Sequence, residues 1–302
     1  MTMNRRGFLK VSAWTIAGTA FLPGLTSCQF GSIRFGWVTD IHYALAPVKW
    51  GRYFSESKEK LSEAITLFNQ SALDFVIETG DFKDQNEPAE KRKTQSYLKD
   101  IETVFAQFNG PRYHVLGNHD LDSLSKMEFQ SIIQNPGILP EHTFYWFEVG
   151  GYRFVVLDAC FREDEVPYDN NNFKWYDTAI PKFQQDWLKH TLYQSQLPVV
   201  VFTHQLLDGE GDLYVKNARH VRKLLENSGK VTAVFQGHKH EGGYNLINGI
   251  HYITQKAMVD GSGAVNSSYS IVELNSDGEI TIEGYRKAES HEFNLEVVAL
   301  SV

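Results

Sequence analysis

The stretch Gly117-Asn118-His119-Asp120 comes directly after residues 112–116, a short and mostly apolar run of the kind that forms a β-strand. Side chains just beyond a strand lie at the edge of a sheet, where the ligands of α/β proteins gather. An amide, an imidazole and a carboxylate at such a position can bind metal ions or transfer protons. This stretch therefore indicates an α/β enzyme with its site at the strand ends.

The same arrangement recurs four more times along the chain. The runs 33–39, 73–79, 198–203 and 231–236 are each followed by metal-competent side chains: Asp40 and His42, Asp81, His204, and His238 and His240. Residues two apart project from one face of an extended chain, and Gly80, Gly117 and Gly237 permit tight turns. Each motif alone is weak, because a single strand-end His is more often an ordinary surface residue. Five in succession indicate one shared metal site.

The order of predicted elements defines the fold class. Strands at 33–39, 73–79 and 112–116 alternate with helices around 61–68 and 98–108, a βαβαβ pattern. Further along, Gly150-Gly151 predicts a hairpin between 143–149 and 152–158, followed by helix, strand, helix and strand up to residue 236. Four more strands are expected after Gly243. We expect one α/β domain over residues 28–302, with two packed mixed β-sheets and helices outside.

Composition limits the classes of partner. The 302 residues carry a formal net charge of −8. The charged residues among the first 27 are all basic, so the net charge of the remainder is more negative still. Such a body repels polyanions, which disfavours binding to a nucleic acid polymer. Apart from Cys28 the only cysteine is Cys160, which lies beside an apolar run and is expected to be a buried small hydrophobe.

Residues 1–27 have the layout of an export signal. A basic segment with Arg5-Arg6 precedes the apolar run 11–22, which is too short to span a bilayer. The segment resembles a twin-arginine signal, and Leu25-Thr26-Ser27-Cys28 resembles a lipobox. The prediction is a periplasmic or cell-surface lipoprotein anchored in a membrane through Cys28, with the inner or outer membrane left open. The alternatives are an ordinary secretory signal with a chance cysteine, or a frayed helix.

Taken in order, the five motifs resemble those of the calcineurin-like metallophosphoesterases over residues 33–240. The resemblance implies a four-layer αββα sandwich and two metal ions, Mn, Fe or Zn, bridged by the Asp81 carboxylate. It implies that the first ion is held by Asp40, His42, Asp81 and His240, and the second by Asp81, Asn118, His204 and His238. A metal-bridged hydroxide would then attack the phosphorus of a small phosphorylated substrate.

His119 has a different expected role from its neighbours. Because Asn118 must face a metal, His119 is free to act as general acid or phosphate donor, and we expect Asp120 to hold its ring and raise its pKa. The alternative is a spare metal ligand. Asp84 either orients a ligand His or lies on the surface. The remaining histidines are read as structural or ordinary: His114, His142, His190, His220, His251 and His291.

The substrate is less well defined. Gly51-Arg52-Tyr53-Phe54 and Asp74-Phe75-Val76-Ile77 are similar to the branch with the manganese-dependent ADP-ribose/CDP-alcohol diphosphatases, which implies a nucleotide diphosphate-type substrate. Animal members of that branch tend to have other residues where His42 and Asp120 stand. The alternatives are a cyclic-nucleotide phosphodiesterase, a broad phosphomonoesterase, or a non-catalytic metal- or phosphate-binding lipoprotein. Residues 162–178 form either a substrate rim or a solvated loop, and oligomeric state is open.

Overall fold

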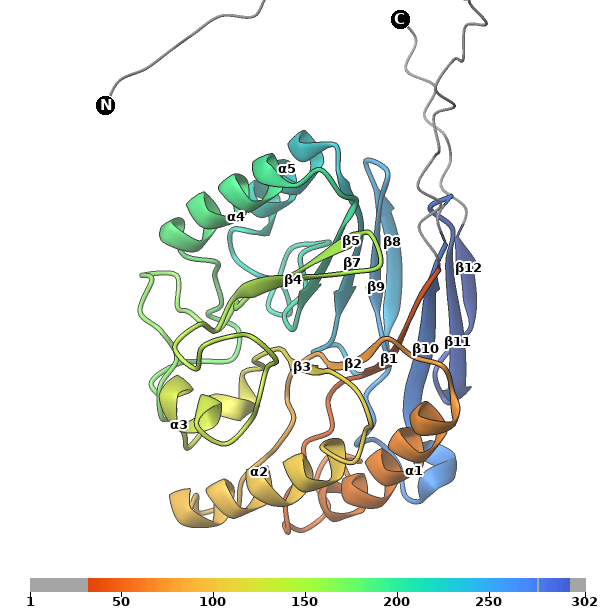
Figure 1. Ribbon diagram of the computed structural model, residues 1–302. Coiled ribbons are helices and arrows are strands. Elements are labelled where there is room, and N and C mark those ends of the chain that lie inside the picture. The colour runs from red at the N-terminus through yellow and green to blue at the C-terminus, as the bar shows by residue number, and fades with distance from the viewer. Residues whose placement is uncertain (1–31, 276, 294–302) are drawn as a thin grey trace, which may run out of the picture.

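A computed structural model describes residues 32–275 and 277–293, in which two six-stranded sheets pack face to face (Figure 1). The first sheet has the order β12-β11-β10-β1-β2-β3 and the second the order β4-β5-β6-β7-β9-β8. The first contains β1 (Ile33–Val38), β2 (Phe75–Glu78), β3 (Arg112–His114), β10 (Ser268–Leu274), β11 (Ile280–Arg286) and β12 (His291–Phe293). The second contains β4 (Tyr145–Val149), β5 (Tyr152–Val156), β6 (Val199–Thr203), β7 (Val231–Gln236), β8 (Gly243–Ile247) and β9 (Ile250–Thr254).

Helices cover the two outer faces, so the molecule has four layers. Figure 1 shows α1 (Ser57–Gln70) and α2 (Lys91–Phe105) side by side on one flank, and α4 (Lys182–Gln194) and α5 (Ala218–Ser228) on the opposite flank. The predicted stripe of α1 is buried against the first sheet: Leu61, Ala64, Ile65 and Phe68. The expected α/β fold with two mixed sheets flanked by helices is confirmed.

The layer between the sheets is rich in aromatic side chains. The ring of Phe35 on β1 stacks on Phe75 of β2 at 4.9 Å and meets Phe154, Phe202 and Phe235 of the second sheet edge-on. Edge-to-face pairs stabilise beyond the apolar area they bury. This rigid interior fixes the register of the strands, and therefore the positions of the residues that follow them.

The parallel strands end at one edge of the molecule. Val38 of β1 pairs with Glu78 of β2, and Thr203 of β6 pairs with Gln236 of β7, so the segments after these four strands start level with one another within each sheet. The third segment of the first sheet follows β3, whose His114 pairs with Glu78. All five sequence motifs lie just beyond these ends.

Several short elements were not expected from the sequence. They are α3 (Lys126–Gln130), β12, and the 3₁₀ helices η1 (Phe54–Glu56), η2 (His119–Leu121) and η3 (Ala264–Asn266). Helix α3 begins with a capping box in which Ser125 and Glu128 satisfy each other's backbone N–H groups, a signature that the sequence does contain.

The export signal and Cys28 fall outside the residues described, so the prediction of lipidation stays a prediction. Across residues 32–275 and 277–293, the helices are all too short or too polar to cross a membrane.

Candidate metal centre

The strand-end segments bring six of the seven predicted ligands into two adjoining groups. Asp40, His42 and His240 form the first, and Asp81, His204 and His238 form the second; within each group the offered ligand atoms lie within 4.8 Å of one another. The seventh, Asn118, is buried at the start of η2. Segments that are up to 200 residues apart in the chain thus converge on one buried site.

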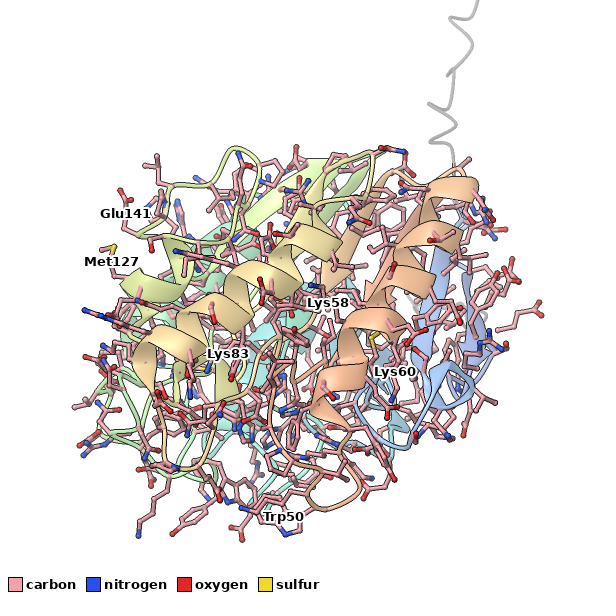
Figure 2. The ribbon with its side chains drawn as sticks, turned by 90° about the horizontal axis from the view of Figure 1, so that it is seen from below. Trp50, Lys58, Lys60, Lys83, Met127 and Glu141 are labelled. Atoms are coloured by element: carbon pink, nitrogen blue, oxygen red, sulfur yellow. The ribbon has the colours of Figure 1, made fainter. Side chains whose placement is uncertain are left out.

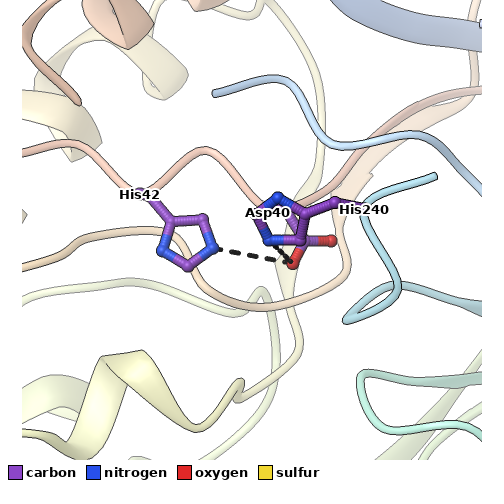
Figure 3. Close-up of side chains that lie close together, drawn as sticks. All are labelled: Asp40, His42 and His240. Atoms are coloured by element: carbon purple, nitrogen blue, oxygen red, sulfur yellow. Dashed lines mark ion pairs between the residues drawn. The ribbon is translucent and has the colours of Figure 1, made fainter. Parts of the chain in front are cut away.

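The first group surrounds one oxygen of Asp40 (Figure 3). Its Oδ1 lies 3.7 Å from Nε2 of His42 and 3.5 Å from Nε2 of His240. Ligands bound at 2.0–2.2 Å to a tetrahedral or octahedral ion stand about 3.0–3.5 Å apart. The spacing is therefore close to that expected around a single metal ion.

Asp81 connects the two groups. Its Oδ2 lies 3.4 Å from Nε2 of His42 and 3.2 Å from Nε2 of His204, while its Oδ1 accepts a hydrogen bond from the backbone N–H of His119 at 2.8 Å. In the second group, Nδ1 of His238 lies 3.3 Å from Nε2 of His204. One oxygen of Asp81 thus faces both groups, so this carboxylate could be shared by two metal ions.

Hydrogen bonds to the far side of three rings leave the site-facing nitrogens free. The Nδ1 atoms of His42, His204 and His240 lie 3.0 Å from Asp84, 2.8 Å from the Thr79 carbonyl and 3.1 Å from Asp260, respectively. These acceptors place the proton on Nδ1 and leave the Nε2 lone pair directed into the site. Asp84 therefore orients a predicted ligand, the first of its two interpretations.

Buried polar atoms without partners provide an independent test of metal binding. Oδ1 of Asp40, Nε2 of His42 and Oδ1 of Asn118 are buried and have no hydrogen-bond partner among the described residues. Leaving such atoms unpaired is costly, so a cluster of them at one place needs an explanation. Two metal ions held by this oxygen and nitrogen donor set satisfy all three atoms, and the residues present fit them.

The backbone at these positions is strained. Asp40, His42, Asp81 and His238 all have positive φ, from 46° to 69°, which residues other than glycine rarely adopt. Strain of this kind costs of order 1–3 kcal/mol per residue and clusters at functional sites. Gly117 is needed for a different reason, close packing: a Cβ at this position would stand 2.2 Å from the backbone N of Asp81.

The electrostatics of the site ionise its carboxylates and protonate one ligand imidazole. Burial would lower the pKa of His204, but Asp81 and Asp40 outweigh it and raise the pKa to about 9, so this ring must release a proton when it binds a metal ion. Burial opposes ionisation of Asp40, but the nearby imidazoles of His42, His204 and His240 hold its pKa well below the ordinary value. Burial is likewise outweighed at Asp81, whose pKa is lowered by His204, His119 and His42. Burial and the charge of His204 lower the pKa of His238 to about 3. Both carboxylates are ionised and His238 is neutral at pH 7.

His119 lies beside the first group with its ring held by a carboxylate. The ring centroid is 4.7 Å from that of His42, and Nδ1 is 2.7 Å from Oδ2 of Asp122 and 3.7 Å from Oδ2 of Asp84. Burial would lower the pKa of His119, but Asp122, Asp84 and Asp81 outweigh it and raise the pKa to about 10. A protonated imidazole at this place can donate a proton.

The expectation that Asp120 holds the ring of His119 is wrong. Its carboxylate instead accepts backbone hydrogen bonds from Gly117 at 2.8 Å, Phe82 at 2.9 Å and Asp81 at 3.0 Å. Residues 119–121 form a 3₁₀ turn, which directs the Asp120 side chain toward residues 81 and 82 after β2. The side chain that lies beside the His119 ring is that of Asp122. Asp120 therefore fixes the Asp81 segment, not the proton donor.

His114 is structural, as expected. It is buried between two carboxylates, 3.0 Å from Glu78 and 3.2 Å from Glu102, and Glu78 also accepts the backbone N–H of Gly80 at 2.8 Å. Cys160 is fully buried, also as expected.

Two loops form the rim of the site. Residues 49–52 make a tight turn with positive φ at Trp50 and Gly51, and Trp50, 77% exposed, lines a pocket of about 360 Å³ together with Arg52 and His119. On the other loop, Trp175 lies 6.0 Å from the ring of His238 and is 44% exposed. The 162–178 segment therefore reaches the second group, which favours the rim interpretation over a solvated loop.

Sequence reasoning missed Asp122 and Asp260, and it offered Trp175 only as part of the candidate rim segment 162–178. Asp122 could have been found from its spacing of three residues after His119, which places two side chains on one face of a helical turn. Asp260 lies in a loop after β9 with no motif of its own, and nothing in the sequence marks it.

Comparisons with known proteins agree with this geometry. The family model described as calcineurin-like phosphoesterase matches residues 33–242. A manganese-dependent ADP-ribose/CDP-alcohol diphosphatase of Oryza sativa subsp. japonica is 24% identical over 85% of this chain and 92% of its own length. Its counterpart of the same name in Arabidopsis thaliana is 25% identical over 86% and 96%. A dimetal phosphatase from Danio rerio shares the fold with a TM-score of 0.70 at 18% identity, covering 87% of this chain and 99% of that one.

Proposed function

The chain belongs to the calcineurin-like phosphoesterases, metal-dependent hydrolases, and on that basis we propose that it hydrolyses the phosphoanhydride bond of a small nucleotide diphosphate-type substrate. The observation that carries the chemistry is the position of Asp81 Oδ2, which faces His42 and His204 at once. The substrate class is supported by the two relatives named as ADP-ribose/CDP-alcohol diphosphatases.

The shape of the rim is consistent with a substrate that has an organic group on each side of the scissile bond. The pocket of about 360 Å³ beside His119 suits the leaving group, and Trp50 and Phe54 give it an apolar wall. Trp175, beside His238, offers a flat apolar face to the group that stays on the attacked phosphorus. Exposed aromatic side chains at such places bind planar groups by stacking.

The residues of the chain divide the work as follows. When bound, two metal ions supply positive charge to the phosphoryl group and activate a water molecule. Asp40 and Asp81 would provide two negative charges, and the histidines would provide neutral donors once His204 has released its proton. Asp122 holds Nδ1 of His119, so the proton on Nε2 is the one available to the leaving oxygen as the bond from phosphorus to that oxygen breaks.

The test is a substrate comparison on the protein starting after Cys28, supplied with Mn²⁺. The substrates are ADP-ribose, CDP-choline, cyclic AMP, bis-p-nitrophenyl phosphate and p-nitrophenyl phosphate, with the Asp81→Ala variant as the control. The expected result is Asp81-dependent cleavage with the highest kcat/KM on the two diphosphates. Cleavage of cyclic AMP or the p-nitrophenyl esters alone would contradict the proposed substrate but keep the chemistry. Binding of Mn²⁺ and phosphate without any turnover would favour the non-catalytic alternative.

We also propose that the chain is exported by the twin-arginine route and anchored through lipidated Cys28, on the strength of Arg5-Arg6 and the Leu25–Cys28 pattern. Expression of the full chain in a bacterium, followed by separation of membranes from soluble extract, tests this. Cys28→Ser is expected to move the protein out of the membrane fraction, whereas Cys160→Ser is the matched control. Equal distribution of the wild type and Cys28→Ser would contradict the anchor.

A further inference from the structure

A buried lysine, Lys60, stands behind the first group of metal ligands. It lies on the first turn of α1, and its side chain is 1% exposed, whereas Lys58 two residues earlier is exposed (Figure 2). A buried ammonium group needs acceptors for its three N–H bonds. Burial, with the charge of Lys287 beside it, lowers the pKa of Lys60 to about 8, which leaves it mainly protonated at pH 7.

The acceptors are backbone carbonyls of a single loop. Nζ of Lys60 donates to the carbonyl oxygens of Gly261 at 2.7 Å, Met258 at 2.9 Å and Val259 at 3.1 Å, with that of Asp260 at 3.5 Å. All three N–H bonds are therefore used within the loop of residues 257–261, which follows β9. The Val259 carbonyl also accepts the N–H of Tyr53 at 3.1 Å, and the Asp260 carbonyl also accepts from Nζ of Lys287 at 3.0 Å. Without the Lys60 ammonium, the carbonyls of Met258 and Gly261 would lose the donor that holds them.

This loop is bound to the metal-ligand segments. The N–H groups of Met258 and Val259 donate to the carbonyls of Thr39 and Asp40, at 3.2 and 3.1 Å. The N–H of Ala257 donates to the carbonyl of His240 at 3.0 Å. The loop therefore contacts the backbone of two predicted ligands of the first ion.

The loop also carries the carboxylate that orients His240. Both oxygens of Asp260 lie 3.1 Å from Nδ1 of His240, whose Nε2 faces Oδ1 of Asp40. A partner of this kind fixes the tautomer and direction of a metal-binding ring. The position of Asp260 depends on the conformation of the loop, and the buried ammonium group of Lys60 donates hydrogen bonds to the carbonyls of that loop.

We propose that Lys60 is a positioning residue for the first metal ion, acting through the 257–261 loop and Asp260 on His240. The proposal rests on the two-metal assignment but not on the identity of the substrate. Lys60 contacts neither ligand nor substrate, so its effect is on the affinity of one ion. Loss of an orienting partner lowers metal affinity by about 10- to 100-fold.

Titration of metal-free protein with Mn²⁺, followed by EPR and by the number of ions bound per chain, tests this without any substrate. For Lys60→Met we expect a loss of about 10- to 100-fold in affinity at one site, so that the spectrum of a single ion persists where the wild type already shows a coupled pair. Lys58→Met is the matched control and should titrate like the wild type. In an Asp260→Asn background, Lys60→Met should add little, because both changes act on the same ring.

A general structural role would give a different pattern. Equal weakening of both sites, or fully additive losses in the double variant, would overturn the proposal, as would wild-type affinity in Lys60→Met. If Lys60→Met does not fold, the same titration is made on Lys60→Gln, whose amide keeps two N–H donors without the charge. A single weakened site is expected there, and wild-type Mn²⁺ affinity would overturn the proposal. Failure of the diphosphatase assay alone leaves these results unchanged, so the two proposals fail separately.

Discussion

The two ligand groups, which we call the floor of the site, and the residues around them come from different parts of the chain. The side chains that face the metals follow strands of the two sheets, such as Asp40 after β1 and Asp81 after β2. The groups that orient them or form the rim, such as Asp260 and Trp175, come from loops. The register of the strands fixes the positions of the side chains that follow them. The sequence and length of loops can vary with little effect on the fold. The comparison indicates that the strand ends supply the metal ligands, whereas loops orient a ligand ring, as Asp260 does, or form the rim that contacts the substrate, as Trp175 does.

The largest effect is expected at the floor, from Asp81→Asn. The amide keeps the size of the side chain but removes the negative charge that faces both ligand groups. We expect a loss of at least roughly 10³-fold in kcat/KM on every substrate, together with fewer than two ions per chain by elemental analysis. Asp186→Asn, an exposed change on α4, is the control. An Asp81→Asn protein with two ions and near-normal turnover would remove the bridging role and with it the distinction between floor and surroundings.

His119→Ala separates metal binding from proton transfer. The ring of His119 also lies within ligand distance of His42 and Asp84, but its Nδ1 is held by Asp122. We therefore expect the variant to retain both ions and to lose roughly 10²- to 10⁴-fold in kcat. The loss should be smaller for p-nitrophenyl esters, whose leaving group needs little help from an acid. Metal analysis alongside kcat makes the test. Loss of an ion in this variant would make His119 a ligand and move it to the floor.

The sequence placed the strand-end residues close to one another, and the structure brings six of the seven together, because their determinants are local. Each ligand follows a recognisable apolar run, and the strand order places those run ends together. The orienting groups follow no such rule. Asp120 was assigned to the His119 ring by adjacency, yet a 3₁₀ turn directs it to the backbone of residues 81 and 82 and leaves the ring to Asp122. The three-residue spacing from His119 to Asp122 identifies this partner only if a helical turn is expected at residues 119–121, and no turn was predicted there.

Asp122→Asn tests whether Asp122, rather than Asp120, holds the ring of His119. The Asp122 carboxylate is the nearest of three that outweigh burial and raise the pKa of His119 to about 10. A general acid works while it is protonated, so activity is lost as pH rises through its pKa. Removing the Asp122 charge lowers that pKa, and the alkaline limb of the kcat profile should move to lower pH. Asp120→Asn should instead lower stability without moving the limb. An unchanged alkaline limb in Asp122→Asn would contradict the assignment.

The smallest effect is expected at the rim, from Trp175→Ala. The indole lies beside His238 of the second ligand group, whereas His119 lies beside His42 of the first, so we expect the indole to contact the group that remains on the phosphorus. We expect KM for CDP-choline and ADP-ribose to rise about 5-fold or more, as loss of a stacked base costs roughly 1–3 kcal/mol, with kcat little changed.

The matched control for Trp175→Ala is Trp146→Ala, since Trp146 on β4 is exposed to a similar degree, 42% against 44%, but lies outside the ligand groups and the rim loops. A second control is the substrate p-nitrophenyl phosphate, which has a leaving group and no retained organic group. Its KM should be the same in the Trp175→Ala variant and the wild type, because the contact that the indole provides is not used. An equal rise in KM for p-nitrophenyl phosphate and CDP-choline would mean that Trp175 supports the ligands themselves, and the loop that carries it would then belong with the floor.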